Sequence, residues 1–212
     1  MLKVRVPTQQ RFILDAVPWE RYTRLLRSLS DRHLRLTYDR GTLEIMTLSH
    51  EHEGLGEFLG LVVVTLTQEL NLGIHLGGST TFRRRRKQKG LEPDKCYWIA
   101  QEAKVRGKTR INLRTDPPPD LAIEIDITHS SIDRMRIYAG LGVPEVWRYD
   151  EQGMTFWGLT ADGKYAPAPV SRSFPMAISA AELMPFIGLR GQMDVNAIIR
   201  QFRAWIQSRL AV

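Results

Sequence analysis

The first third of the chain alternates between helical and strand-like spacing of its apolar residues. Trp19, Tyr22 and Leu26 recur at helical intervals after Pro18, a residue type that suits the first turn of a helix. The next segment alternates apolar and polar residues on both sides of a turn that contains Gly41, which is the pattern of a β-hairpin. The predicted elements are a helix over 18–29, a hairpin over 34–47 and a long amphipathic helix over 50–70.

Proline and glycine divide the remainder into shorter elements. Pro93 opens one apolar run, three prolines at 117–119 exclude helix before another, and Gly142 ends a helical segment. The predicted elements are strands over 74–83, 93–99, 120–128, 144–149 and 155–159, helices over 131–141, 179–187 and 193–209, and a basic loop over 83–91. This order predicts a mixed α/β fold. We expect a single domain over 1–212, with a core over 30–160 and a C-terminal extension over 161–212.

The predicted strand over 120–128 carries two carboxylates on one face. Because side chains alternate along a strand, Glu124 and Asp126 point to one side while Ile123 and Ile125 point to the other. A strand so rich in β-branched residues is usually central, and buried like charges require a neutralising cation such as a divalent metal. The alternative is an edge strand whose acidic face is solvated.

Two further acidic positions and one histidine are candidates for the same site. Asp94 follows Pro93 at the start of a strand, where it either presents a carboxylate at the strand end or simply forms a turn. Glu51 and His52 precede Leu55 by four and three residues, so we expect both to lean toward the sheet. The alternatives are a helix-dipole role for Glu51 and a buried, hydrogen-bonded role for His52.

Arg134 is the candidate basic residue of the site. It shares one helix face with Tyr138 and Leu141, which predicts that it lies near the acidic strand. Ser130 with Asp133 resembles a capping box for this helix. The alternative is an ordinary surface arginine.

Charge and cysteine content limit the classes of partner and the cellular compartments that fit this chain. The chain has 30 Lys and Arg against 23 Asp and Glu, a formal charge of +7, which is compatible with a polyanionic partner such as DNA. With Cys96 as the single cysteine, an internal disulfide and a cysteine-rich zinc site are excluded, and a cytoplasmic location fits. No apolar stretch approaches the roughly 20 residues that span a bilayer, so we expect no membrane partner. The sequence is compatible with either a monomer or a homodimer. The candidate phosphate contacts are Arg83, Arg84, Arg85, Arg86, Lys87 and Lys89, unless this run is only a solvated loop.

A set of short motifs follows a fixed order between residues 10 and 160. They are Glu51-His52, Phe82-Arg83-Arg84, Glu92-Pro93-Asp94, Asp120 to Asp126, Ser130-Ser131, Ile137-Tyr138 and Gly142 to Trp147. Together they resemble the Uma-type putative endonuclease family of the PD-(D/E)XK superfamily. The resemblance implies a restriction-endonuclease-like fold: a mixed central sheet flanked by helices, with an N-terminal helix and hairpin and a C-terminal helical extension.

The same resemblance implies a nuclease site. Asp94 and Glu124 would hold Mg²⁺ or Mn²⁺, and Glu51 would be an additional acidic residue. The superfamily lysine, two residues after the second acid, is Asp126 here, and the lysine that this family carries on the following helix is Arg134. Arginine keeps the positive charge but cannot accept a proton from water.

The expected function is therefore metal-dependent hydrolysis of DNA phosphodiester bonds. The alternative is a catalytically weak or inactive nuclease fold that acts as a nucleic-acid-binding or assembly module. A serine or cysteine hydrolase is disfavoured, because Cys96 has no evident partner and the chain has no Gly-x-Ser-x-Gly sequence.

Overall fold

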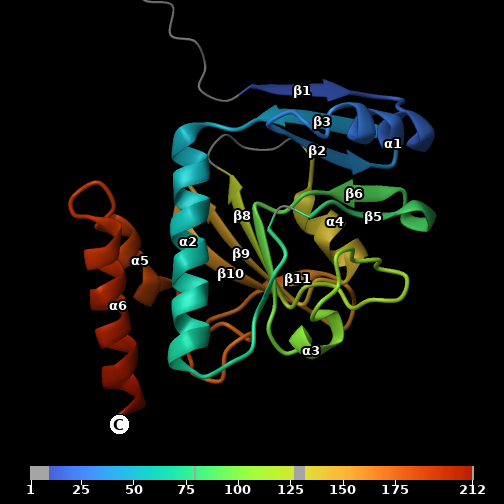
Figure 1. Cartoon of the computed structure of the whole chain (residues 1–212). Coiled ribbons are helices and arrows are strands. Elements are labelled where there is room, and N and C mark those ends of the chain that lie inside the picture. The colour runs from blue at the N-terminus through green and yellow to red at the C-terminus, as the bar shows by residue number, and fades with distance from the viewer. Residues whose placement is uncertain (1–9, 79, 127–131, 212) are drawn as a thin grey trace, which may run out of the picture.

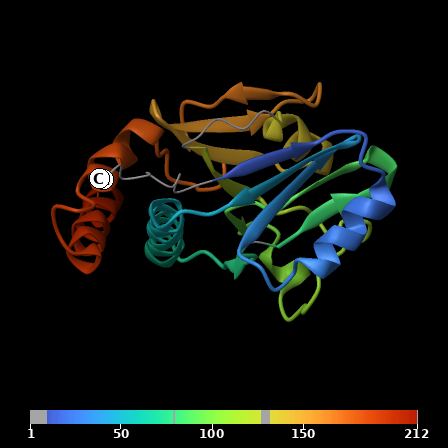
Figure 2. The same cartoon turned by 90° about the horizontal axis from the view of Figure 1, so that it is seen from above.

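The computed structural model describes residues 10–78, 80–126 and 132–211 and has a mixed α/β architecture built on two sheets (Figures 1 and 2). The five-stranded sheet has the order β1-β3-β2-β6-β5 and consists of β1 (Arg11–Leu14), β2 (Leu34–Asp39), β3 (Thr42–Thr47), β5 (Phe82–Arg84) and β6 (Lys89–Leu91). The six-stranded sheet has the order β11-β10-β9-β8-β7-β4 and consists of β4 (His75–Leu76), β7 (Lys95–Trp98), β8 (Leu121–Asp126), β9 (Glu145–Asp150), β10 (Gly153–Leu159) and β11 (Tyr165–Pro167).

The helices lie on both sides of this framework. They are α1 (Trp19–Ser28), α2 (His50–Glu69), α3 (Glu102–Val105), α4 (Arg134–Leu141), α5 (Ala180–Gly188) and α6 (Val195–Leu210). In Figure 1, α2 runs along the six-stranded sheet and α6 lies on the far side of α2. Among the described residues, no helix combines the length and the apolar character that a bilayer-spanning segment needs.

Strand β8 is one of the two central strands of the six-stranded sheet, as its β-branched sequence predicts. It pairs with β9 in parallel and with β7 in antiparallel orientation. Leu121, Ile123 and Ile125 pack in a cluster with residues of α2, α5 and α6. Ala122, on the opposite face, packs in a second cluster with Tyr138 and other residues of α4. Glu124 and Asp126 share the face of Ala122, and both are buried, so the solvated-edge alternative is wrong.

The five-stranded sheet gives the chain a second buried layer. Helix α1 covers one of its faces, where Trp19, Tyr22 and Tyr38 form an aromatic cluster. On β3, Leu43 belongs to that cluster. The next residue, Glu44, lies on the opposite face of the strand and is buried as well. Both faces of this strand are therefore covered, which the alternating pattern of the hairpin does not reveal.

Most predicted elements are confirmed, and the exceptions have local causes. The strand predicted over 74–83 is two strands, β4 and β5. The loop predicted over 83–91 is wrong: residues 82–91 form the β5–β6 hairpin, whose turn is a 3₁₀ segment (Arg85–Lys87) closed by Gln88 in the left-handed region. The run of like charges hides this hairpin, because only its ends are apolar. Strands β1 and β11 and the short helix α3 were not predicted, since each is too short to show a period.

Helix α4 begins later than predicted. Its N-cap is Asp133, whose side chain accepts from the backbone N–H of Arg136. The helix therefore starts at Arg134 rather than at residue 131, and Ser130, the predicted cap, lies outside the described residues. Gly142 ends the helix in the left-handed conformation, as predicted.

Candidate active site at the junction of the two sheets

Strands β7 and β8 bring Asp94 and Glu124 to one place, as the sequence predicts. Lys95 pairs with Ile123, so Asp94 lies beside the carboxyl end of β8. There its Oδ2 accepts a 2.7 Å hydrogen bond from the backbone N–H of Ile125. The side chains of Asp94 and Glu124 are each only 3% exposed. Two carboxylates are thus held together away from solvent, an arrangement that requires compensating positive charge.

Glu124 receives part of that compensation from α4. Arg134 Nε lies 2.8 Å from Glu124 Oε1, and the hydroxyl of Tyr138 donates to Glu124 Oε2 at 2.7 Å. Arg134 is itself buried, so the surface-arginine alternative is wrong. Burial raises the pKa of Glu124 despite the adjacent guanidinium, and the charge of Asp94 raises it further.

His52 occupies the other side of Asp94. Its Nε2 lies 3.2 Å from the carbonyl oxygen of Ile125 and 3.4 Å from Asp94 Oδ1. Burial works against charge on the imidazole, but Asp94 and Glu124 outweigh it and raise the pKa of His52. Burial likewise opposes charge on Asp94, and the neighbouring His52 nevertheless keeps the pKa of Asp94 below its usual value. His52 is thus a buried, hydrogen-bonded histidine.

Glu51 does not reach this site. Its side chain is exposed, and the expectation that it leans toward the sheet is wrong. The buried face of α2 follows His52, Leu55 and Leu59, and Glu51 is turned about 100° from His52 around the helix axis.

The five-stranded sheet supplies further charged side chains that the sequence did not single out. Glu44 on β3 is 1% exposed and lies 4.0 Å from Arg134 Nη1. Arg11 on β1 contacts Glu44 at 3.4 Å and Asp126 at 3.2 Å. Asp126 also contacts Arg148 of β9 at 3.1 Å. The two sheets are therefore joined by ion pairs at the site.

Arg35 of β2 completes this set. Its Nε lies 3.9 Å from Asp94 Oδ1 and its Nη1 lies 3.8 Å from Glu92 Oε2. We call the whole set the ionic cluster; it consists of Glu44, Glu92, Asp94, Glu124, Asp126, Arg11, Arg35, Arg134, Arg148 and His52. Arginine and histidine thus provide the positive charge that the carboxylates require.

A small opening leads to the cluster beside α4. A cavity of about 130 Å³ is lined by Glu124, Asp126, Ile132, Asp133, Arg134, Met135 and Arg148. Through this cavity, a small ligand from solvent can contact Glu124, Asp126 and two arginines. Acidic and basic side chains both line the cavity. A site that holds a phosphate together with a cation needs both.

The residues present fit a hard divalent cation in chemistry. Asp94 Oδ1 is buried and forms no hydrogen bond within the described part of the chain, and Glu124 adds a second carboxylate. Among residues 10–78, 80–126 and 132–211, no group of three or more His, Cys, Asp or Glu side chains is arranged to hold a metal. Mg²⁺ is commonly held by one or two carboxylates and completes its shell with water, so a pair of acids suffices.

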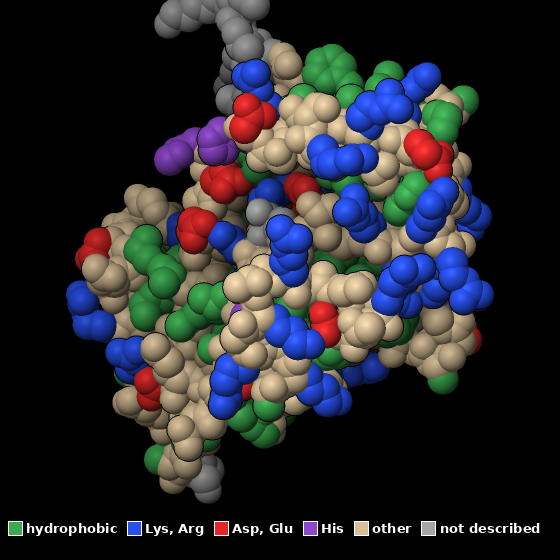
Figure 3. All heavy atoms as spheres, turned by 45° about the vertical axis from the view of Figure 1, so that its right-hand side comes forward, with side chains coloured by type: hydrophobic (Ala, Val, Ile, Leu, Met, Phe, Trp, Pro, Cys, Tyr) green, Lys and Arg blue, Asp and Glu red, His purple; other side chains and the backbone are tan. Residues whose placement is uncertain are grey.

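The six basic candidates of residues 83–89 lie in different environments. Arg83, Arg85, Arg86 and Lys87 are exposed, whereas Arg84 is partly buried and donates to the carbonyl of Leu113. Lys89 is buried, and its ammonium donates to the carbonyl of Arg136 at 2.7 Å. Figure 3 shows Lys and Arg side chains spread over the face that it presents, while several acidic side chains gather beside the His side chains at its upper left.

The comparisons with known proteins place this chain in a family. Residues 19–193 match the Uma2 model, whose description is "Putative restriction endonuclease". The chain belongs to this family. A crystal structure described as a putative nuclease belonging to DUF820 from Anabaena variabilis is similar, with a TM-score of 0.49 and 14% sequence identity. The match covers 71% of this chain and 89% of that one. No curated protein matched the chain.

Proposed function

We propose that this protein hydrolyses phosphodiester bonds of DNA with the help of Mg²⁺ or Mn²⁺ held by Asp94 and Glu124. The observation that carries the proposal is Asp94 Oδ1, a buried carboxylate oxygen that lacks a hydrogen bond among the described residues and lies next to a second buried acid. Membership in a family whose model is described as "Putative restriction endonuclease" supports the reaction class. When bound, the metal would supply an activated water and offset charge on the phosphate.

The other side chains of the cluster have separate roles in this proposal. Arg134 stabilises negative charge that develops on the phosphate, since a guanidinium remains protonated and cannot act as the base. Asp126 fixes Arg148 beside the small cavity through their 3.1 Å contact. His52 keeps its proton on Nε2, between the carbonyl of Ile125 and Asp94, and thereby orients Asp94.

A second candidate function is a nucleic-acid-binding or assembly module without catalysis. The observation that favours it is the contact between Arg134 and Glu124, in which the arginine already occupies an oxygen that a metal would use. Such a protein would bind DNA and leave it intact.

Calorimetric titration with MgCl₂ and MnCl₂ separates the two candidates. We expect weak binding to the wild type, no binding to Asp94→Asn or to Glu124→Gln, and unchanged binding to Glu151→Gln, an exposed acid on the same protein. A plasmid-nicking assay on the same four proteins then tests catalysis. Metal binding that survives in both site variants would overturn the assignment of the metal ligands, and DNA binding without nicking would favour the binding module.

A further inference from the structure

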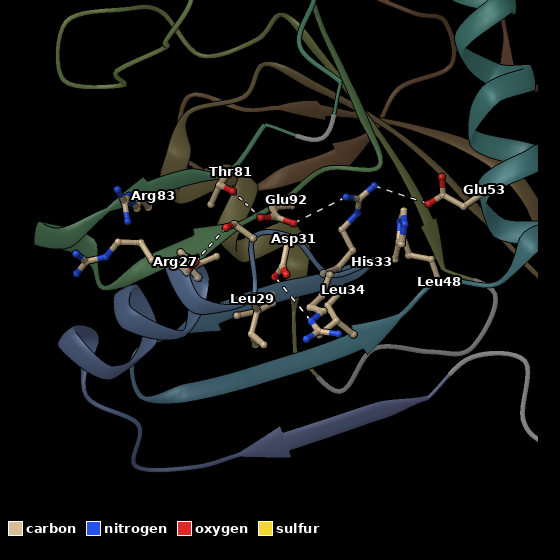
Figure 4. A pocket seen from close by; sticks show the side chains of 15 residues that line it. Arg27, Leu29, Asp31, His33, Leu34, Leu48, Glu53, Thr81, Arg83 and Glu92 are labelled. Carbon is tan, nitrogen blue, oxygen red and sulfur yellow. Dashed lines mark hydrogen bonds and ion pairs between the residues drawn. The ribbon is translucent and has the colours of Figure 1, made fainter.

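A larger cavity, of about 690 Å³, lies beside the ionic cluster (Figure 4). It is bounded by the end of α1 and the segment that follows, by β2, and by Thr81 and Arg83 at the start of the β5–β6 hairpin. Leu29, Leu34 and Leu48 give it apolar walls. Its volume is in the range of ligand-binding pockets, which is about 300–1,000 Å³.

The cavity reaches the candidate active site through Arg35. This side chain and Glu92 line the cavity, and both also belong to the ionic cluster. Arg35 Nε lies 3.9 Å from Asp94 Oδ1, so a single side chain separates the cavity from the proposed metal ligand. A chain that occupies the cavity is thereby led toward Asp94.

Two arginines of the cavity are not neutralised by a carboxylate. Arg32 is paired with Asp31 at 3.7 Å, and Arg35 is paired with Glu92. By contrast, Arg27 and Arg83 form no ion pair within the described part of the chain, and both are exposed. Arg27 donates from Nε to the carbonyl of Thr23, which leaves its two terminal nitrogens available.

The positions of these two arginines suit an extended anionic ligand. Figure 4 shows Arg27 and Arg83 at the same end of the cavity, away from Glu53. One comes from α1 and the other from β5, so the two guanidinium groups face a ligand from two elements. Guanidinium groups bind phosphate oxygens in bidentate geometry.

We propose that this cavity receives one strand of the nucleic-acid substrate and that Arg27 and Arg83 hold its phosphates. The inference rests on the proposed function, and it names the surface by which the substrate approaches Asp94. None of the 15 residues that line the cavity is Phe, Tyr or Trp. Among the described residues, His33 is the only aromatic ring that lines the cavity, so binding here rests mainly on phosphate contacts, which carry no sequence information and make binding tolerant of sequence.

The same hairpin provides a matched control. Arg85 and Arg86 are exposed and carry the same charge, but they do not line the cavity. Arg85 is also paired with Glu20 at 2.8 Å. The double variants Arg27→Ala/Arg83→Ala and Arg85→Ala/Arg86→Ala therefore remove equal charge from inside and outside the cavity.

Fluorescence anisotropy with a labelled duplex oligonucleotide and with its single strand, in EDTA over a series of salt concentrations, tests the inference without catalysis. For the cavity variant we expect weaker binding and a salt slope that is flatter by about 1.8 on duplex, or by about 1.4 on a single strand. The control variant should keep most of its slope, and Arg27→Lys/Arg83→Lys should keep the slope as well, since the charge remains.

The outcomes that contradict the inference are distinct from those that contradict the function. Equal losses in the two double variants would overturn the cavity as the binding surface, while DNA binding and the proposed function would stand. Wild-type protein that binds neither oligonucleotide would overturn both. A cavity variant that binds DNA like the wild type would assign Arg27 and Arg83 to the solvated surface.

Discussion

Arg134 and Glu124 form a buried contact, with 2.8 Å between Nε and Oε1 and side chains that are 5% and 3% exposed. The arginine thus occupies an oxygen of the carboxylate that we propose as a metal ligand. A guanidinium and a divalent cation compete for the same oxygen, because both are positively charged partners of a carboxylate. This competition has consequences for activity and for stability.

For activity, we predict that Arg134→Lys raises Mn²⁺-dependent nicking of plasmid DNA above the wild-type level. Lysine is a compact point charge that competes less for Glu124 and can orient a water molecule. A positioned proton transfer contributes about 10²–10⁴ in rate, which bounds the gain. Wild type, Arg134→Lys and Arg134→Ala should be assayed side by side. If alanine retains full activity and lysine adds none, Arg134 has no part in catalysis.

For stability, Arg134→Ala should lower the free energy of unfolding by about 3–5 kcal/mol, because it leaves Glu124 buried without its partner. Urea unfolding in EDTA measures this loss. Arg136→Ala, an exposed position on the same helix, is the matched control and should change the free energy of unfolding by less than about 0.5 kcal/mol. Adding Glu124→Gln to Arg134→Ala should recover part of the loss, and strict additivity of the two changes would contradict a direct interaction.

The parts of this site that depend on local spacing could be predicted from the sequence. The position of Arg134 followed from its helix face, and the pairing of Asp94 with Glu124 followed from two neighbouring strands. Arg11 could not be found in this way, since its contact with Asp126 spans 115 positions. Glu44 was hidden for a related reason: its strand alternates like one with a solvated face, and only the packing of the second sheet buries it.

The pKa of His52 predicts a pH dependence of stability. A histidine whose pKa is raised in the folded state contributes stability below its unfolded pKa of 6.5, and this stability is lost as the pH rises through the folded pKa. The pKa of Glu124 is also raised in the folded state. Its contribution to stability is therefore likewise lost as the pH rises above its unfolded pKa of 4.5. Wild-type protein should therefore become less stable from about pH 5 to about pH 8.

Replacing His52 isolates its contribution to this change of unfolding free energy with pH. His52→Gln keeps a donor for the carbonyl of Ile125 and removes the titration, so its unfolding free energy should change less with pH than that of the wild type. His50→Gln, at an exposed position of the same helix turn, should retain the wild-type slope. Urea unfolding in EDTA across this pH range measures all three proteins, and identical slopes for His52→Gln and wild type would contradict the assignment.

Lys89 is the most buried of the basic residues in the β5–β6 hairpin. We predict that replacing it lowers the stability of the protein. Its stem packs so closely on α4 that a Cβ at Gly140 would lie 2.7 Å from Lys89 Cδ. Its ammonium donates to the carbonyl of Arg136, and burial lowers the pKa of Lys89. Lys89→Ala removes the donor and leaves that carbonyl without it, which should lower the free energy of unfolding by about 1–3 kcal/mol. Lys87→Ala, at an exposed position of the same hairpin, should leave the unfolding free energy within about 0.5 kcal/mol of wild type. The salt slope of DNA binding distinguishes this role from a phosphate contact, because a contact adds about 0.9 to the slope. A Lys89→Ala protein of wild-type stability with a flatter salt slope would return Lys89 to the nucleic-acid surface.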